Sequence, residues 1–269
     1  SYEALQAAFA EFAGRIPFWG AAVLCHDSPG VQAILPRMTR RTVTFGTTSQ
    51  ADLVAADLVP EGTGIRFSVR WRGELLGSAH TRLPGRHNVL NALATLAVAR
   101  ELDVPFDVAA DGLSSFVGIE RRFEHKGEVG GVRVVDDYGH HPTEIRATLE
   151  AARSVHEGRI LVGFQPHRYT RTRDLWDEFV TAFNQADVLV LTEIYAAGED
   201  KIPGVDAARL LEAIRAHGHR DAHFIANLDD VLDDLAQRAA PGDLILTLGA
   251  GSISNLGTRL VERLREDRP

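Results

Sequence analysis

Chemically reactive side chains gather in two short segments, each directly after an apolar run typical of a buried strand. The run ending at Val135 is followed by Asp-Asp-Tyr-Gly-His-His-Pro at 136–142, and the run 160–164 by Gln-Pro-His-Arg-Tyr-Thr-Arg at 165–171. In an open α/β sheet, ligands bind beyond the carboxyl ends of the strands. One segment offers negative charge and the other positive charge. Together they predict a site for a substrate that carries both hydroxyl and anionic groups.

Asp136 and Asp137 end the first run, and two roles fit them. A carboxylate at a strand end accepts hydrogen bonds from ribose hydroxyls in nucleotide-binding folds. Alternatively, the pair caps the turn into a helix that begins near Pro142. Because neighbouring residues on a strand point to opposite faces, only one of the two is expected to face a ligand.

His140 and His141 invite a metal-site interpretation, which the rest of the sequence does not favour. Adjacent histidines project differently, and no further His, Cys or Glu completes a known ligand spacing. We therefore predict no metal ligand in this chain and a hydrogen-bonding role for the histidines.

The second segment holds the densest positive cluster of an acidic chain, His167, Arg168, Arg171 and Arg173. Arg168 and Arg171 are three residues apart near a helix start, so they can share a face. Guanidinium groups match carboxylates and phosphates, and cations at a helix N-terminus oppose the helix dipole. The pattern favours an anionic ligand, and a solvated helix end is the alternative.

Polar residues also begin an earlier predicted helix, at His87, Asn88 and Asn91. The two amides lie on one face of the first turn, and a carboxamide both donates and accepts, as a purine edge requires. Alternatively, Asn88 is only the helix N-cap.

Further along, Arg121 and Arg122 form either a phosphate contact or a solvated pair. Neither of the two lysines, Lys126 and Lys201, stands in a phosphate-loop motif, and Gly249-Ala250-Gly251 lacks the third glycine of a dinucleotide fingerprint. We read these glycines as a tight turn between strand and helix.

The pattern of predicted strands and helices changes near residue 118. Short antiparallel strands are predicted within 52–83. A helix is predicted to start within 84–88, with apolar positions up to Ala97, and a second helix covers 106–116, whereas regular alternation of strands and helices follows. That alternation predicts an α/β fold with a mostly parallel, doubly wound sheet. We place the domain boundary between 118 and 119. Strands are expected near 129–136, 159–164, 187–193, 222–225 and 243–248, with helices near 142–154, 171–185, 206–217, 228–239 and 253–266.

Composition narrows the class of protein. The net charge of −8 disfavours a nucleic-acid partner, and apolar runs of about five residues are too short to span a membrane. Cys25 is the only cysteine, so no internal disulfide is possible, which fits a reducing compartment. We expect a cytoplasmic protein of two domains.

Four motifs resemble the Mur ligases: Gly85-Arg-His-Asn-Val-Leu-Asn-Ala92, Arg121-Arg-Phe123, the 136–142 segment and His167-Arg-Tyr-Thr-Arg-Thr172. The asparagines and the arginine pair are shared by the wider family. The other two motifs are more specific to its alanine-adding member. This similarity implies an α/β central ATPase domain, partly present here as 1–118 without its phosphate loop. It further implies a Rossmann-like C-terminal domain at 119–269.

The resemblance also implies an activity and residue roles. The expected reaction joins L-alanine to the lactyl carboxylate of UDP-N-acetylmuramate through an acyl phosphate, with ATP and Mg²⁺. By resemblance, His167, Arg168 and Arg171 hold the alanine or muramoyl carboxylate. The nucleotide contacts are then expected at His87, Asn88, Asn91, Arg122, Asp137, Tyr138 and His140.

The family's phosphate loop, magnesium ligands and UDP-sugar domain have no counterpart in these residues. We therefore expect a piece of a longer enzyme, inactive alone, whose missing partner is the N-terminal part of that enzyme. A nucleotide- or partner-binding module without activity, or another Mur ligase relative such as a tripeptide-recycling ligase, is the alternative.

Overall fold

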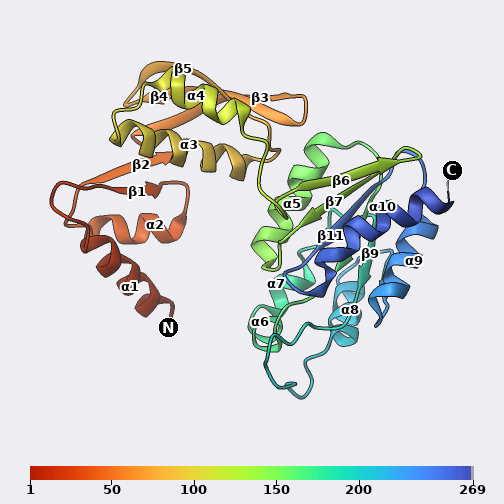
Figure 1. Ribbon diagram of the computed structural model, residues 1–269. Coiled ribbons are helices and arrows are strands. Elements are labelled where there is room, and N and C mark those ends of the chain that lie inside the picture. Colours follow the sequence, from red (N-terminus) through yellow and green to blue (C-terminus); the bar gives the residue numbers. More distant parts are fainter. Residues whose placement is uncertain (268–269) are drawn as a thin grey trace. The chain divides into compact units, whose positions relative to one another are not determined.

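The computed structural model describes residues 1–267. They form two compact units, unit 1 from Ser1 to Val117 and unit 2 from Gly118 onward (Figure 1). The predicted boundary lies one residue from this division. In unit 1, β1 (Ala22–Cys25), β2 (Thr42–Gly46) and β3 (Leu53–Glu61) are parallel, and β4 (Gly64–Trp71) and β5 (Glu74–Thr81) continue the sheet as an antiparallel meander.

The helices of unit 1 follow from apolar spacing. In α3 (Arg86–Glu101), Val89, Leu93 and Leu96 are buried against the sheet, where they meet Phe45 and Phe67. The remaining helical elements are α1 (Tyr2–Gly14), α2 (Pro29–Ile34), the 3₁₀ turn η1 (Leu35–Arg37) and α4 (Phe106–Ser115). The predicted helices and antiparallel strands of this unit are confirmed.

Unit 2 is a six-stranded sheet in the order β10-β9-β8-β11-β7-β6. Its strands are β6 (Glu124–Val129), β7 (Val132–Asp137), β8 (Ile160–Phe164), β9 (Val188–Leu191), β10 (Ala222–Phe224) and β11 (Leu244–Leu248). All pairs are parallel except β6 with β7, so the mostly parallel sheet is confirmed. The antiparallel edge strand β6 was not predicted, although Gly130-Gly131 is a two-glycine hairpin turn.

Helices cover both faces of this sheet, because apolar strand residues alternate between two cores. Val162 and Phe164 enter one core and Leu161 the other. The first core receives α5 (Pro142–Val155), α7 (Trp176–Val180) and α8 (Ala207–Ala216), and the second receives α9 (Leu228–Arg238), η2 (Ser252–Asn255) and α10 (Leu256–Asp267).

The strand order places a topological switch in the middle of the sheet. The chain passes from β7 to β8, β9 and β10 and then returns to insert β11 between β8 and β7. In the register, Leu248 at the end of β11 pairs with both Asp137 and Phe164. The carboxyl ends of these three strands are therefore level, which is the position where such folds bind ligands.

One expectation about the helices was wrong. The helix predicted at 171–185 is two short helices, α6 (Tyr169–Asp174) and α7, with Leu175 between them. Because α6 has only six residues, Arg171 and Arg173 belong to its last turn. The helix-dipole argument for an anionic ligand at these arginines therefore does not hold.

Candidate active site

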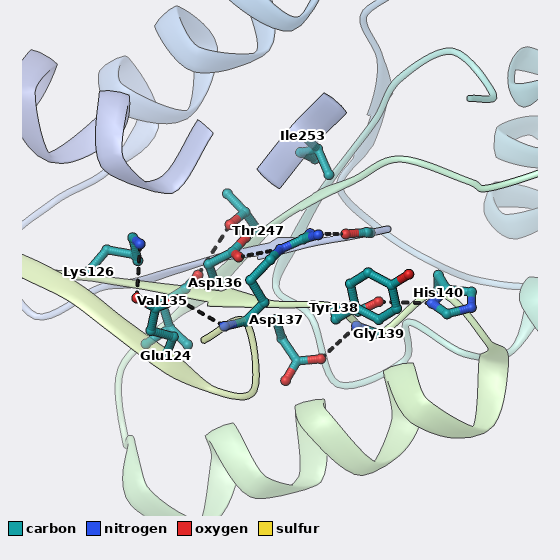
Figure 2. A network of polar contacts seen from close by, with 12 residues as sticks. Glu124, Lys126, Val135, Asp136, Asp137, Tyr138, Gly139, His140, Thr247 and Ile253 are labelled. Carbon is teal, nitrogen blue, oxygen red and sulfur yellow. Dashed lines mark hydrogen bonds and ion pairs between the residues drawn. The ribbon is translucent and has the colours of Figure 1, made fainter. Parts of the chain in front are cut away.

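The two aspartates that end β7 point to opposite faces of the sheet, as expected (Figure 2). Asp136 is fully buried; its carboxylate accepts from Thr247 Oγ1 at 2.6 Å and from Arg121 Nε at 3.1 Å. Arg121 also donates to the Gly249 carbonyl. Burial raises the pKa of Asp136, which the bonds from Thr247 and Arg121 oppose. This pair ties the start of unit 2 to β7 and to the turn after β11.

Asp137 holds the turn that follows it. It is 5% exposed, and it accepts from the backbone N–H of Phe123 (2.8 Å), from that of Gly139 (2.7 Å) and from Thr148 Oγ1 (3.3 Å). Burial raises its pKa, while these donors favour the ionised form. The carboxylate is thus engaged inside the protein, and direct contact with a ribose is not supported.

The N-cap of α5 is His141, so neither aspartate caps the helix itself; of the two, Asp137 holds the turn that leads into it. His141 Nδ1 accepts from Thr143 N at 3.2 Å, and Glu144 completes a capping box. The Glu144 carboxylate also accepts from His140 N at 3.1 Å and lies 3.8 Å from Arg122 Nη1. Burial acts to raise the Glu144 pKa, but these donors and charges lower it on balance.

Four rings form a row across the ends of β7, β8 and β9; we call Tyr138, His140, His167 and Tyr195 the ring row. Their successive centroid distances are 5.0, 5.7 and 5.4 Å. The predicted residues Tyr138, His140 and His167 therefore come together. Tyr195 was missed, because it follows β9 by four residues and no motif marks it.

Cations lie beside the ring row at Tyr138 and at His167. Arg121 and Arg122 place their guanidinium carbons 4.9 and 5.5 Å from the Tyr138 ring centroid. Arg171 donates to the His167 carbonyl at 3.1 Å. Arg121 is drawn inward by Asp136, whereas Arg122 keeps 45% of its side chain exposed and is the one available to a ligand.

Arg168 is held by a carboxylate that the sequence did not reveal. Glu199 Oε1 lies 3.8 Å from Arg168 Nη1, and the same side chain accepts from Thr170 N and Thr170 Oγ1. Half of the Arg168 side chain remains exposed. The cluster thus offers a positive, accessible surface, in which Glu199 holds Arg168 in place.

The pKa of His167 lies below its ordinary value, first because of burial and then because of the nearby charge of Arg171. Below pH 6.5, the unfolded chain therefore binds a proton at His167 more readily than the folded protein does. The stability that the neutral His167 contributes is fully present above the unfolded pKa of about 6.5, and it is lost as the pH falls through the folded pKa.

Replacing Arg171 with Met is expected to raise the His167 pKa, because a positive neighbour is removed. Titration of the His167 ring by ¹H–¹³C NMR measures the change. Arg173→Met is the matched control, since Arg173 pairs with Asp174 and is not among the groups that act on His167. An unchanged midpoint in Arg171→Met would show that Arg171 does not act on the imidazole.

In unit 1, the predicted polar residues lie at the start of α3. The N-cap is Gly85, so the alternative that Asn88 is the cap is wrong. Asn88 Nδ2 donates to the Pro84 carbonyl at 2.8 Å, and its Oδ1 lies 3.3 Å from Asn91 Nδ2. His87 Nε2 is 3.1 Å from Asn88 Nδ2, so the three predicted side chains form one polar group.

Sequence reasoning missed the side chains that anchor this helix start. Arg86 binds Asp27 and Thr47, which follow β1 and β2 respectively. Asp27 in turn accepts from Thr47 N at 3.0 Å. The carboxyl ends of two parallel strands are thereby joined to the start of α3, which carries Asn88 and Asn91.

Unit 1 also contains an apolar cavity. This cavity of about 630 Å³ is lined by α1, β1 and α2 and includes Phe9, Phe12 and Cys25 but no charged side chain. It does not suit an anionic substrate. Within 1–267, no helix is long and apolar enough to cross a membrane, and no group of three or more His, Cys, Asp or Glu is placed to hold a metal ion.

Two domain families match the sequence: the Mur ligase middle domain at 1–99 and the Mur ligase glutamate ligase domain at 121–251. The chain is 53% identical to the UDP-N-acetylmuramate–L-alanine ligase of Sorangium cellulosum and 51% identical to that of Solibacter usitatus. These alignments cover 100% and 98% of this chain but only 58% and 56% of the relatives. The chain thus spans somewhat over half the length of the curated relatives it matches.

Solved structures agree. The UDP-N-acetylmuramate-alanine ligase of Thermotoga maritima matches with a TM-score of 0.80 and 25% identity, over 100% of this chain and 56% of that one. An ADP complex of a MurF ligase from the same organism matches with a TM-score of 0.76 over 99% and 58%, and at 20% identity it shows the fold alone. The resemblance seen in the motifs is confirmed: the chain belongs to the Mur ligase family.

Proposed function

We propose that this chain serves in the ATP-dependent joining of L-alanine to the lactyl carboxylate of UDP-N-acetylmuramate, a step of peptidoglycan precursor synthesis. The observation that carries the proposal is the cationic cluster of His167, Arg168 and Arg171 beside the ring row, at the switch point of the sheet. Identity of 53% over the whole chain to a relative of that name supports it. The single cysteine is consistent with action in the cytoplasm.

The reaction requires groups that position the substrates and neutralise negative charge, and it requires no nucleophile from the protein. In the proposed sequence, the lactyl carboxylate attacks the γ-phosphorus of ATP, and ADP leaves. The alanine amine then attacks the resulting acyl phosphate, losing a proton, and inorganic phosphate leaves as the amide forms. Both steps concentrate negative charge, which cations must neutralise.

The cluster fits the carboxylate of the incoming amino acid or of the muramoyl group. Arg168 is half exposed, and a guanidinium can bind a carboxylate through two parallel hydrogen bonds. Arg171 and His167 complete the positive surface. A carboxylate held in this way leaves the alanine amine free to be aimed at the acyl carbon.

Nucleotide contacts are proposed in both units. In unit 2, Arg122, Tyr138 and His140 offer an exposed cation and ring faces, and Asp137 contributes by holding their turn. In unit 1, His87, Asn88 and Asn91 present the donors and acceptors that a purine edge requires.

Magnesium is expected in the reaction, since phosphoryl transfer depends on it. By resemblance to the family, its protein ligands are expected in the N-terminal part of the enzyme, so we assign no magnesium ligand to this chain and route no step through the ion.

The test is a reconstituted ligase, in which this chain replaces the matching part of the Sorangium cellulosum relative. We expect release of phosphate from ATP that requires both UDP-N-acetylmuramate and L-alanine. The intact relative is the positive control, and circular dichroism verifies that the chimera folds. We expect no release from the 269-residue chain alone. A folded chimera that is active with another amino acid but not with alanine would refute the proposed substrate.

A further inference from the structure

Tyr195 contacts the cationic cluster although it lies on a different strand end. Its ring stacks on the His167 imidazole with centroids 5.4 Å apart and planes at 19°. The His140 ring centroid is 5.7 Å from that of His167. The imidazole thus contacts two rings, and Tyr195 is 41% exposed, so part of its side chain faces solvent.

The backbone fixes this stack. Tyr195 N donates to the Pro166 carbonyl and Arg168 N donates to the Tyr195 carbonyl, each at 2.8 Å. His167 and Tyr195 form an isolated parallel bridge beyond the ends of β8 and β9. Arg168 has a φ of 74°, a conformation that an L-residue rarely adopts. The hydrogen bond that Arg168 N donates to the Tyr195 carbonyl helps to maintain it.

Gly251 supports Tyr195 from the turn after β11. A Cβ atom at Gly251 would lie 2.7 Å from Tyr195 Cγ and 2.5 Å from Gln165 Oε1, closer than carbon contacts allow. The glycine is therefore needed so that this turn can approach the ring. This contact gives the Gly249-Ala250-Gly251 segment a packing role that a dinucleotide fingerprint does not explain.

The same segment after β9 also holds Arg168. Glu199, four residues beyond Tyr195, pairs with Arg168 and accepts two hydrogen bonds from Thr170. Tyr195 and Glu199 thus contact two of the three members of the cluster, His167 and Arg168. The position of this segment is fixed by the backbone hydrogen bonds of Tyr195 to Pro166 and Arg168.

We propose that Tyr195 is a positioning residue for the amino-acid carboxylate, acting through the stacked His167 ring and the backbone of Arg168. The inference rests on the proposed function and deepens it by assigning the segment after β9 to the amino-acid subsite. Tyr195 is expected to act through its ring and not through its hydroxyl, because the ring is what contacts His167.

The test compares Tyr195→Leu with Tyr195→Phe. In the reconstituted ligase, Tyr195→Leu is expected to raise the KM for L-alanine about tenfold, a factor in line with the strength of aromatic pairs, with the KM for ATP changed less than about twofold. Tyr195→Phe keeps the ring and should stay within about twofold of the parent for both substrates. An unchanged alanine KM in Tyr195→Leu, or an equal loss in Tyr195→Phe, would overturn the proposal.

A second readout uses the 269-residue chain and does not depend on activity. The His167 ring ¹H resonance should lose its ring-current shift in Tyr195→Leu and keep it in Tyr195→Phe. A resonance that does not move in Tyr195→Leu would contradict the stack. If the ligase with Tyr195 intact fails to use alanine, the proposed function and its amino-acid subsite fall together, and the resonance still shows whether Tyr195 positions His167.

Discussion

Replacing Arg168 with Ala is expected to raise the KM for L-alanine by about 10–100-fold in the reconstituted ligase, because a hydrogen-bonded charge contributes about 1.5–3 kcal/mol. The KM for ATP should change less than about twofold, since the proposed nucleotide contacts of unit 2 lie at the other end of the ring row. The change also leaves Glu199 without its cationic partner, which adds a repulsive carboxylate near the subsite. Initial rates at varied alanine and at varied ATP separate the two effects.

Arg173→Ala provides the matched control for this result. Arg173 lies on the same short helix and is exposed, but it pairs with Asp174 instead of with the cluster. We expect its alanine KM to remain near that of the parent. Arg168→Lys should recover only part of the loss, because an ammonium group cannot bind a carboxylate through a planar fork. Equal increases in the KM of ATP and alanine for Arg168→Ala would show that Arg168 has no selective role in the amino-acid subsite.

The parts of the site that lie directly after strands were predictable from the sequence. Tyr138, His140 and His167 come within three residues of a strand end, and parallel strands bring such positions to one edge. The order of the strands was not predictable, because apolar alternation does not say where a returning strand inserts. The insertion of β11 between β7 and β8 creates the switch point at which the two reactive turns lie.

Partners supplied by distant segments were missed for a different reason. Tyr195 and Glu199 follow β9 within an irregular stretch, where no periodicity indicates which side chain turns inward. The roles of the aspartates also needed the structure, since the sequence allowed ribose binding or capping of the turn into the helix. Burial and three donors show that Asp137 organises this turn.

Replacing Asp136 with Ala should produce the largest loss of stability, about 3–5 kcal/mol in the free energy of unfolding of unit 2. The carboxylate is fully buried, and its removal leaves the mostly buried Arg121 guanidinium and the Thr247 hydroxyl without their acceptor. Urea denaturation measures the change. In a background with Trp19 and Trp71 replaced by Phe, Trp176 is the only tryptophan and reports on unit 2 alone.

Two further variants identify the cause of that loss. Asp233→Ala breaks an exposed pair with Arg263, and surface pairs contribute about 0–1 kcal/mol, so it should change stability little. The double variant Arg121→Met, Asp136→Leu should recover part of the loss. The reason is that Asp136→Ala destabilises the protein mainly by leaving the Arg121 charge unpaired, and less by removing a salt bridge. A double variant as unstable as Asp136→Ala would mean that the pair is needed for its geometry. The hydrogen bonds from Arg121 to Asp136 and Gly249 would then be what holds the ends of β7 and β11 in register.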